Sequence, residues 1–237
     1  MPPRWWPEIE VVQQLALFDL DHTLIPLDSD HAWGEFTIAL GWADAQAFRR
    51  CNDAFYAQYQ AGTLDIAEYV RFATAALRTL DPADAEAGRA RFMAEVIEPA
   101  IHAQALELVA GHQRRGDAVA VVTATSEWVT RPIADRFGVA DLIAMRLQLD
   151  AAGRPTGAIA GVPSFGAGKV TRVGQWLAAR ELGWRDVHVT FYSDSFNDLP
   201  LLEHVQQPVA TNPDAQLRRI ARQRDWTVLD LFKDQDS

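Results

Sequence analysis

Four aspartates form two closely spaced pairs that lie far apart along the chain. Asp19 and Asp21 follow the apolar residues 15–18, while Asp194 and Asp198 follow a second apolar run. A single Asp-x-Asp pair is common in solvated turns and indicates little. If the fold brings the two pairs together, four like charges converge, which is strongly unfavourable without a cation. Carboxylate, carbonyl and water oxygens favour Mg²⁺ over zinc, so the pattern predicts a magnesium site.

Lysine is rare in this chain. Lys169 and Lys233 are the two lysines among 22 Lys and Arg residues. Lys169 follows a Gly-Ala-Gly sequence at the start of an expected helix, where a compact ammonium can contact phosphate; a solvated first-turn lysine is the alternative. The segment 163–170 also approaches the P-loop pattern of nucleotide-binding proteins. We reject that interpretation, because Pro163 replaces the first glycine and Val170 replaces the metal-binding hydroxyl.

Short apolar runs that end in polar residues alternate with helical patterns over much of the chain. This alternation predicts an α/β fold with a Rossmann-like, three-layer parallel sheet core. Asp19, Thr123 and Asp194 each end an expected strand, where such sheets bind ligands. The expected strands lie at 15–18, 118–122, 187–192, 208–210 and 227–229, with a hairpin over 142–159 and helices at 99–115, 127–137, 169–182 and 214–224.

Residues 28–96 depart from this alternation. Ala, Leu, Phe and Tyr recur there at spacings of three and four residues, and the stretch has little strand character. We therefore expect a small, all-helical cap domain at 28–96, inserted into an α/β core formed by 1–27 and 97–237.

The ordered motifs resemble those of haloacid dehalogenase-like (HAD) phosphatases. FDLDHTL at 18–24 is similar to the first motif, VVT at 121–123 to the second, Lys169 to the third and YSDSFND at 192–198 to the fourth. The fourth motif and the place of the helical insertion resemble the phosphoserine phosphatase-like branch (subfamily IB), whose members carry a helical C1-type cap.

The resemblance implies a role for each motif residue. Asp19 would attack phosphorus and become a phosphoaspartate, while Asp21 would protonate the leaving alcohol and then activate water. Crowding by Asp19 and Asp194 should raise the pKa of Asp21. Thr123 and Lys169 would hold phosphoryl oxygens, and Asn197 would line the phosphate site. The implied Mg²⁺ site comprises Asp19, the backbone carbonyl of Asp21, Asp194 and Asp198, the last orienting either Lys169 or a metal-bound water.

The cap is expected to enclose a small substrate. Phosphoserine phosphatases place a Glu nine residues after the nucleophile to hold the substrate amine, and Asp28 occupies that position here. The shorter side chain is still compatible with a substrate that carries an amine, but it weakens the case for phosphoserine. Histidinol phosphate is therefore the other candidate. Asp28, Asp30 and Glu35 could instead form a solvated helix start. Arg71 is a candidate partner for a substrate carboxylate, although exposure to water is favoured; His22 and His31 receive no role.

These patterns predict a magnesium-dependent phosphomonoesterase that acts on a small metabolite through a phosphoaspartate. A phosphotransferase or mutase, and a non-enzymatic phospho-switch, are the alternatives.

The net charge of -10 argues against nucleic-acid binding. The start has no signal-peptide pattern and no window is apolar enough to span a membrane, so we expect a cytoplasmic protein without a membrane partner. Cys51 is the single cysteine, which excludes an intramolecular disulfide. The oligomeric state stays open.

Overall fold

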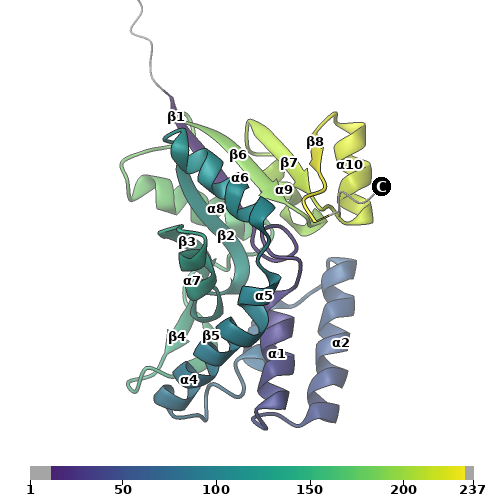
Figure 1. Cartoon of the computed structure of the whole chain (residues 1–237), viewed down its shortest axis with the longest axis vertical. Helices are drawn as coiled ribbons and strands as arrows, with labels where there is room; N and C mark the ends of the chain where they lie inside the picture. Colours follow the sequence, from purple (N-terminus) through teal and green to yellow (C-terminus); the bar gives the residue numbers. More distant parts are fainter. Residues whose placement is uncertain (1–11, 233–237) are drawn as a thin grey trace, which may run out of the picture.

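A six-stranded parallel sheet forms the centre of the structure, a computed structural model that describes residues 12–232. Lys233 lies outside the described residues. The strand order β3-β2-β1-β6-β7-β8 places the two motif-bearing strands β1 and β6 side by side (Figure 1). The predicted α/β architecture is therefore confirmed. The strands are β1 (Gln13–Phe18), β2 (Ala118–Ser126), β3 (Asp141–Met145), β6 (Val187–Ser193), β7 (Gln207–Thr211) and β8 (Thr227–Leu229).

Helices cover both faces of the sheet because the central strands are apolar on both sides. Phe18 and Val121 face α6 (Ala103–Arg114) and α7 (Glu127–Arg136). Leu17 and Val122 belong to the opposite layer, whose helices are α8 (Ala167–Ala178), α9 (Leu199–Leu202) and α10 (Ala215–Gln223). The chain thus forms three layers with a hydrophobic cluster on each side of the sheet.

A helical segment, called the cap below, follows β1, as the sequence predicts. It contains α1 (Ser29–Ala39), α2 (Ala45–Ala61), α3 (Ile66–Ala73) and α4 (Pro82–Phe92), then a π-helical turn (Met93–Ile97) and the short α5 (Glu98–Ala100). The first four helices each begin after an Asp whose side chain accepts a backbone N–H, the favoured N-cap arrangement. Trp33 and Phe92 join the same hydrophobic cluster as Phe18 of the core. Because this cluster crosses the expected boundary, the division at 28–96 stays a prediction.

Helix α2 packs differently from α1 and α4. Of its 17 residues, Asn52 alone is buried. Figure 1 shows α2 beside α1, on the outside of the cap. Neither α2 nor any other helix within residues 12–232 combines the length and apolar character needed to cross a membrane.

The expected hairpin over 142–159 is wrong in its first part. Asp141–Met145 is β3, which pairs in parallel with β2 at the edge of the main sheet. The antiparallel hairpin is shorter and joins β4 (Leu147–Leu149) to β5 (Pro155–Ile159). The apolar run Leu-Ile-Ala-Met at 142–145 is the pattern of a buried parallel strand, whereas the exposed positions in β4 and β5 are typical of a surface hairpin.

Candidate active site

The carboxyl ends of three neighbouring strands carry the predicted site. Asp19 directly follows β1, Thr123 lies near the end of β2, and Asp194 directly follows β6. The backbone N–H of Asp19 donates to the carbonyl of Tyr192 (2.9 Å), which fixes the first motif against the fourth. A cavity of about 650 Å³ opens here between the sheet and the cap. Its wall includes each predicted site residue: Asp19, Asp21, Asp28, Thr123, Lys169, Asp194, Asn197 and Asp198.

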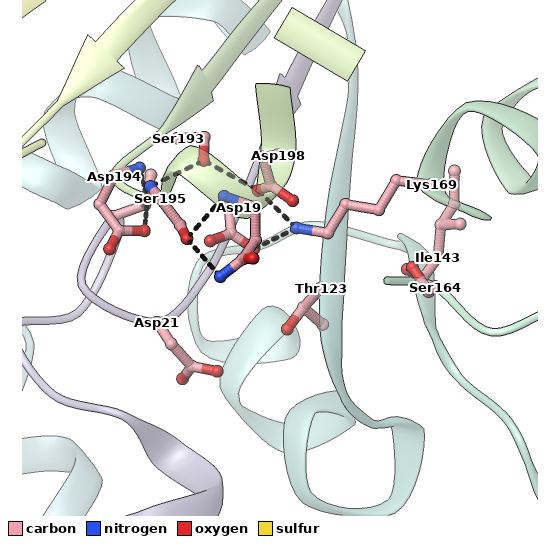
Figure 2. Close-up of polar contacts among 12 residues, drawn as sticks. Asp19, Asp21, Thr123, Ile143, Ser164, Lys169, Ser193, Asp194, Ser195 and Asp198 are labelled. Carbon is pink, nitrogen blue, oxygen red and sulfur yellow. Dashed lines mark hydrogen bonds and ion pairs between the residues drawn. The ribbon is translucent and has the colours of Figure 1, made fainter. Parts of the chain in front are cut away.

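Lys169 is buried between two of the aspartates. Its Nζ lies 2.9 Å from Asp19 Oδ1 and 2.6 Å from Asp198 Oδ2, and Ser193 Oγ donates to the same Asp198 oxygen (2.8 Å). Figure 2 shows the ammonium pointing into this group. Burial alone would lower the pKa of Lys169, but the two carboxylates outweigh it and raise the pKa. A fixed ammonium beside Asp19 can balance negative charge on a phosphoryl group.

A close backbone approach places Lys169 in the first turn of α8. A Cβ atom added to Gly168 would lie 2.0 Å from the carbonyl oxygen of Pro163. Glycine is therefore required at this position. Gly168 thus lets the first turn of α8 approach the Pro163 carbonyl closely, and this approach brings Lys169 to the ends of the strands.

Asp194 connects the fourth motif to the first through Thr23. The Thr23 hydroxyl donates to Asp194 Oδ1 (3.1 Å) and accepts the backbone N–H of Asp194 (3.0 Å). Burial, together with the charges of Asp19 and Asp198, raises the pKa of Asp194 well above its usual value. Burial contributes most to this pKa shift, and a cation would relieve the part that comes from the neighbouring carboxylates.

Asp21 lies apart from the lysine group, on the cap side (Figure 2). Its Oδ1 accepts the backbone N–H of Ser29 (2.8 Å) and its Oδ2 accepts the hydroxyl of Thr125 (2.7 Å). Burial raises the pKa of Asp21 well above its usual value, and the charges of Asp28 and then Asp19 add to the effect. The predicted rise in the pKa of Asp21 agrees with the structure. The predicted cause needs correction, because Asp28 replaces Asp194 beside Asp19 as a contributor.

Thr123 and Asn197 occupy different parts of the cavity wall. Thr123 is buried, and its hydroxyl accepts the backbone N–H of Thr125 (3.1 Å). Asn197 Nδ2 donates to the backbone carbonyl of Tyr59 in α2 (3.3 Å). Asn197 therefore links the core to the cap as well as lining the site.

The oxygen atoms at the strand ends fit a magnesium ion held in part by water. Asp19 and Asp194 are close enough for the charge of Asp19 to raise the pKa of Asp194. The side chains of Asp21 and Asp198 are engaged elsewhere, and within residues 12–232 no three His, Cys, Asp or Glu side chains form a metal-binding group. Because Mg²⁺ usually retains several waters and takes one or two carboxylates, two buried aspartates suit it.

The acidic candidates near the cap separate into two groups. Asp28 and Asp30 line the cavity, as do His22 and His31. Glu35 instead pairs with Arg49 (2.7 Å), and neither side chain lines the cavity. Arg71 also lies elsewhere, because a Cβ atom added to Gly157 of β5 would lie 3.4 Å from its Cγ atom. Arg71 therefore packs against the hairpin.

The sequence did not single out several polar residues that support the site. Three hydroxyl groups donate to the aspartates: Thr23 to Asp194, Thr125 to Asp21 and Ser193 to Asp198. In addition, Tyr59 Oη donates to Ser195 Oγ (2.9 Å). Thr125 had a signal, because residues two apart on a strand share a face and Thr123 was already a candidate. The contact of Tyr59 depends on how α2 sits over the sheet, which its sequence pattern does not specify.

Known proteins resemble the chain over most of its length. The model of the haloacid dehalogenase-like hydrolase family matches residues 16–203. A histidinol-phosphatase of Neisseria meningitidis serogroup C (strain 8013) is 42% identical over 221 residues, covering 93% of this chain and 100% of that protein. A protein of unknown function from Bordetella pertussis Tohama I superposes with a TM-score of 0.88 at 47% identity, covering 94% of this chain and 100% of that one.

A substrate-bound phosphoserine phosphatase shares the fold, with a TM-score of 0.66 at 18% identity; the match covers 92% of this chain and 94% of that one. The family match runs from residue 16 to residue 203 of the described residues 12–232, and it includes all four motifs. The chain belongs to the haloacid dehalogenase-like hydrolases, within their phosphoserine phosphatase-like branch.

Proposed function

We propose that the chain is a magnesium-dependent phosphomonoesterase that hydrolyses a small phosphorylated metabolite through a phosphoaspartate on Asp19. Phosphatase-named relatives support the reaction class. The observation that carries the mechanism is the position of Asp19, at the end of β1, with one carboxylate oxygen 2.9 Å from the Lys169 ammonium. A buried carboxylate beside a fixed cation can meet a phosphate dianion that carboxylates alone would repel.

The proposed reaction has two steps. In the first, Asp19 attacks phosphorus, the bond to the ester oxygen breaks, and protonated Asp21 gives its proton to the leaving alkoxide. In the second, Asp21 takes a proton from water, which attacks the aspartyl phosphate and releases inorganic phosphate. Thr123 and Lys169 hold the phosphoryl oxygens. The raised pKa of Asp21 supports its role as the acid.

Asp19, Asp194 and the backbone carbonyl of Asp21 would hold Mg²⁺, with Asp198 orienting Lys169. When bound, the ion would neutralise the carboxylates and polarise the phosphoryl group. Amino-alcohol phosphates such as phosphoserine or histidinol phosphate are the favoured substrates. Asp28 in the cavity wall and the name of the Neisseria relative support this class.

The test measures release of inorganic phosphate from p-nitrophenyl phosphate with Mg²⁺ and no acceptor alcohol. We expect turnover by the native chain, loss of turnover in Asp19→Asn, and a phosphorylated Asp19 in acid-quenched native protein. Full activity in Asp19→Asn would remove the nucleophile assignment. A stable phosphoprotein that releases phosphate only to an added alcohol would favour the phosphotransferase alternative instead.

A further inference from the structure

The cap side of the cavity is acidic and aromatic. Asp28 and Asp30, at the start of α1, line it together with Tyr69 of α3 and Phe55 of α2. The Tyr69 hydroxyl lies close enough to the Asp30 carboxyl to lower its pKa, and the rings of Phe55 and Tyr69 lie 5.5 Å apart, edge to face. Burial and the charge of Asp28 raise the pKa of Asp30 to about 7. The wall therefore holds two neighbouring carboxyl groups at the edge of an aromatic surface.

No built-in cation compensates these two carboxyl groups. Among the lining residues within 12–232, Lys169 is the sole Lys or Arg, and Asp19 and Asp198 already bind its ammonium. His22 and His31 are the other basic groups in the wall. A cationic ligand would supply the missing charge, because an opposite charge favours the ionised form of both carboxyls.

Asn52 supplies an independent indication of a ligand on this side. It is 5% exposed, it lines the cavity, and its Nδ2 has no hydrogen-bond partner among the described residues. Buried amide groups are nearly always hydrogen-bonded, and an unpaired donor destabilises a protein. Asn52 is also the single buried residue of α2. An acceptor atom on a bound molecule would complete its hydrogen bonding.

The same wall offers little to a carboxylate. Arg71, the residue that could have bound one, packs against the hairpin. A carboxylate placed near Asp28 and Asp30 would be repelled, because like charges in a partly dehydrated site are unfavourable. Phosphoserine and a carboxylate-free amino-alcohol phosphate should therefore differ strongly in affinity.

We propose that the cap side binds the tail of a phosphate ester that carries an ammonium group and a second nitrogen on a planar ring, and lacks a carboxylate. This rests on the proposed function and narrows its substrate class. Asp28 and Asp30 accept hydrogen bonds from the ammonium group and from a ring N–H, Asn52 donates to the unprotonated nitrogen of the neutral ring, and the rings of Phe55 and Tyr69 pack against the planar group. Asp30 and Asn52 are then specificity-determining residues.

The first experiment measures binding without turnover. Calorimetry with the Asp19→Asn protein compares three probes: histidinol phosphate, phosphoserine and phosphoethanolamine. We expect histidinol phosphate to bind at least about tenfold more tightly than phosphoserine, with phosphoethanolamine between them, because it has an ammonium group but no ring. Equal or tighter binding of phosphoserine would overturn the proposal.

The second experiment measures kcat and KM for Asp30→Asn, Asn52→Leu and the matched control Glu35→Gln. Glu35 lies on the same helix as Asp30 but outside the cavity. Asp30→Asn should raise the KM for histidinol phosphate about tenfold with kcat within about twofold, and Asn52→Leu should raise it several-fold. Both losses should be several-fold smaller with p-nitrophenyl phosphate, which has no cationic group, and Glu35→Gln should leave the kinetics with every substrate unchanged. An equal effect on all substrates would contradict the proposal.

Thermal unfolding separates this role from a structural one. The pKa of Asp30, about 7 in the folded protein against a usual 3.8, means that its carboxyl stabilises the fold at low pH and loses that contribution as pH rises through 7. Asp30→Asn cannot ionise, so it should unfold at a higher temperature than the native chain at pH 8. A lower unfolding temperature would mark Asp30 as structural. If the native chain binds histidinol phosphate more tightly than phosphoserine but does not hydrolyse p-nitrophenyl phosphate, the proposed function is wrong and the proposed binding site stands.

Discussion

Asp21 differs from the other motif aspartates in its neighbours, because Thr125 and the backbone of Ser29 bind it on the cap side, away from Lys169. We predict that Asp21→Asn keeps the fold, since Asn has a similar shape. Formation of the phosphoenzyme from an alkyl phosphate should slow by about 10²–10⁴-fold, the usual contribution of an acid catalyst. With p-nitrophenyl phosphate the loss should be much smaller, because its phenolate leaves without a proton. Single-turnover measurements test this, and equal losses for both substrates would contradict an acid role.

Lys169 balances two buried carboxylates, so its removal should affect stability as well as activity. We predict that Lys169→Met, measured without metal, lowers the free energy of unfolding by about 3–5 kcal/mol, because Asp19 and Asp198 lose their shared cation. The double variant Lys169→Met/Asp198→Asn should recover part of that loss. Additive effects in denaturant unfolding would show that the two side chains do not interact.

His112 occupies a buried network behind the site. Its Nδ1 lies 2.7 Å from Asp117, a carboxylate that can only accept, so Nδ1 carries the proton and Nε2 accepts the Tyr192 hydroxyl (2.8 Å). Burial lowers the pKa of His112 despite Asp117. Below the usual value of 6.5 the unfolded chain therefore binds more protons than the folded one, and stability falls as pH falls.

We predict that His112→Gln removes the part of the acid destabilisation that comes from protonation of His112. Denaturant unfolding at pH 5.5 and 7.5 should show a smaller loss of stability on acidification in the variant than in the native chain. Comparing the two proteins cancels the opposite contributions of Asp21, Asp30 and Asp194, whose raised pKa values stabilise the fold at low pH. An identical pH dependence in both proteins would show that His112 does not titrate differently on folding.

The elements of the core could be predicted because strong local patterns specify them. The apolar runs before Asp19 and Asp194 can be buried only as strands covered on both faces, and their polar ends meet at one edge. The start of the hairpin was predicted wrongly, because only Arg146 separates two short segments that each contain apolar residues, and their pairing partners lie in different sheets. The neighbours of Asp21 likewise required the packing of α1 against β2, which no local pattern specifies.

Helix α2 is held over the site by polar contacts. Its Tyr59 hydroxyl donates to Ser195 Oγ (2.9 Å), and Asn197 Nδ2 donates to the Tyr59 carbonyl (3.3 Å). Its partly buried Phe48 and Phe55 pack against Phe72 of α3, but no apolar residue of α2 is fully buried, so these polar contacts contribute to holding the helix over the site.

We therefore predict that Tyr59→Phe, which removes about 1 kcal/mol of hydrogen bonding, raises KM several-fold. Hydrogen exchange should speed up in α2 and stay unchanged in α1. Tyr56→Phe is the matched control for hydrogen exchange on the same helix, since Tyr56 lines the cavity but is 48% exposed. Faster exchange in α1 as well would indicate general destabilisation rather than release of α2.

At the scale of the whole molecule, an acidic protein must attract a phosphate dianion. The chain has a net charge of -10, and its site gathers Asp19, Asp194 and Asp198 around one lysine. Long-range attraction therefore cannot deliver the substrate, and local compensation is required. The proposed Mg²⁺ would provide that compensation and should bind the folded chain in preference to the unfolded one.

We predict that Mg²⁺ stabilises the protein by mass action, by about 2.7 kcal/mol at a hundredfold excess over its dissociation constant, and that a chelator reverses the effect. Asp194→Asn should behave oppositely in two measurements. Without metal it should unfold at a higher temperature than the native chain, because repulsion from Asp19 and Asp198 is relieved. Adding Mg²⁺ should raise the unfolding temperature of Asp194→Asn only slightly. In Glu35→Gln, remote from the site, Mg²⁺ should raise it as much as in the native chain. An equal gain in Asp194→Asn would place the ion somewhere other than beside Asp19, and phosphate binding would then have to rely on Lys169 alone.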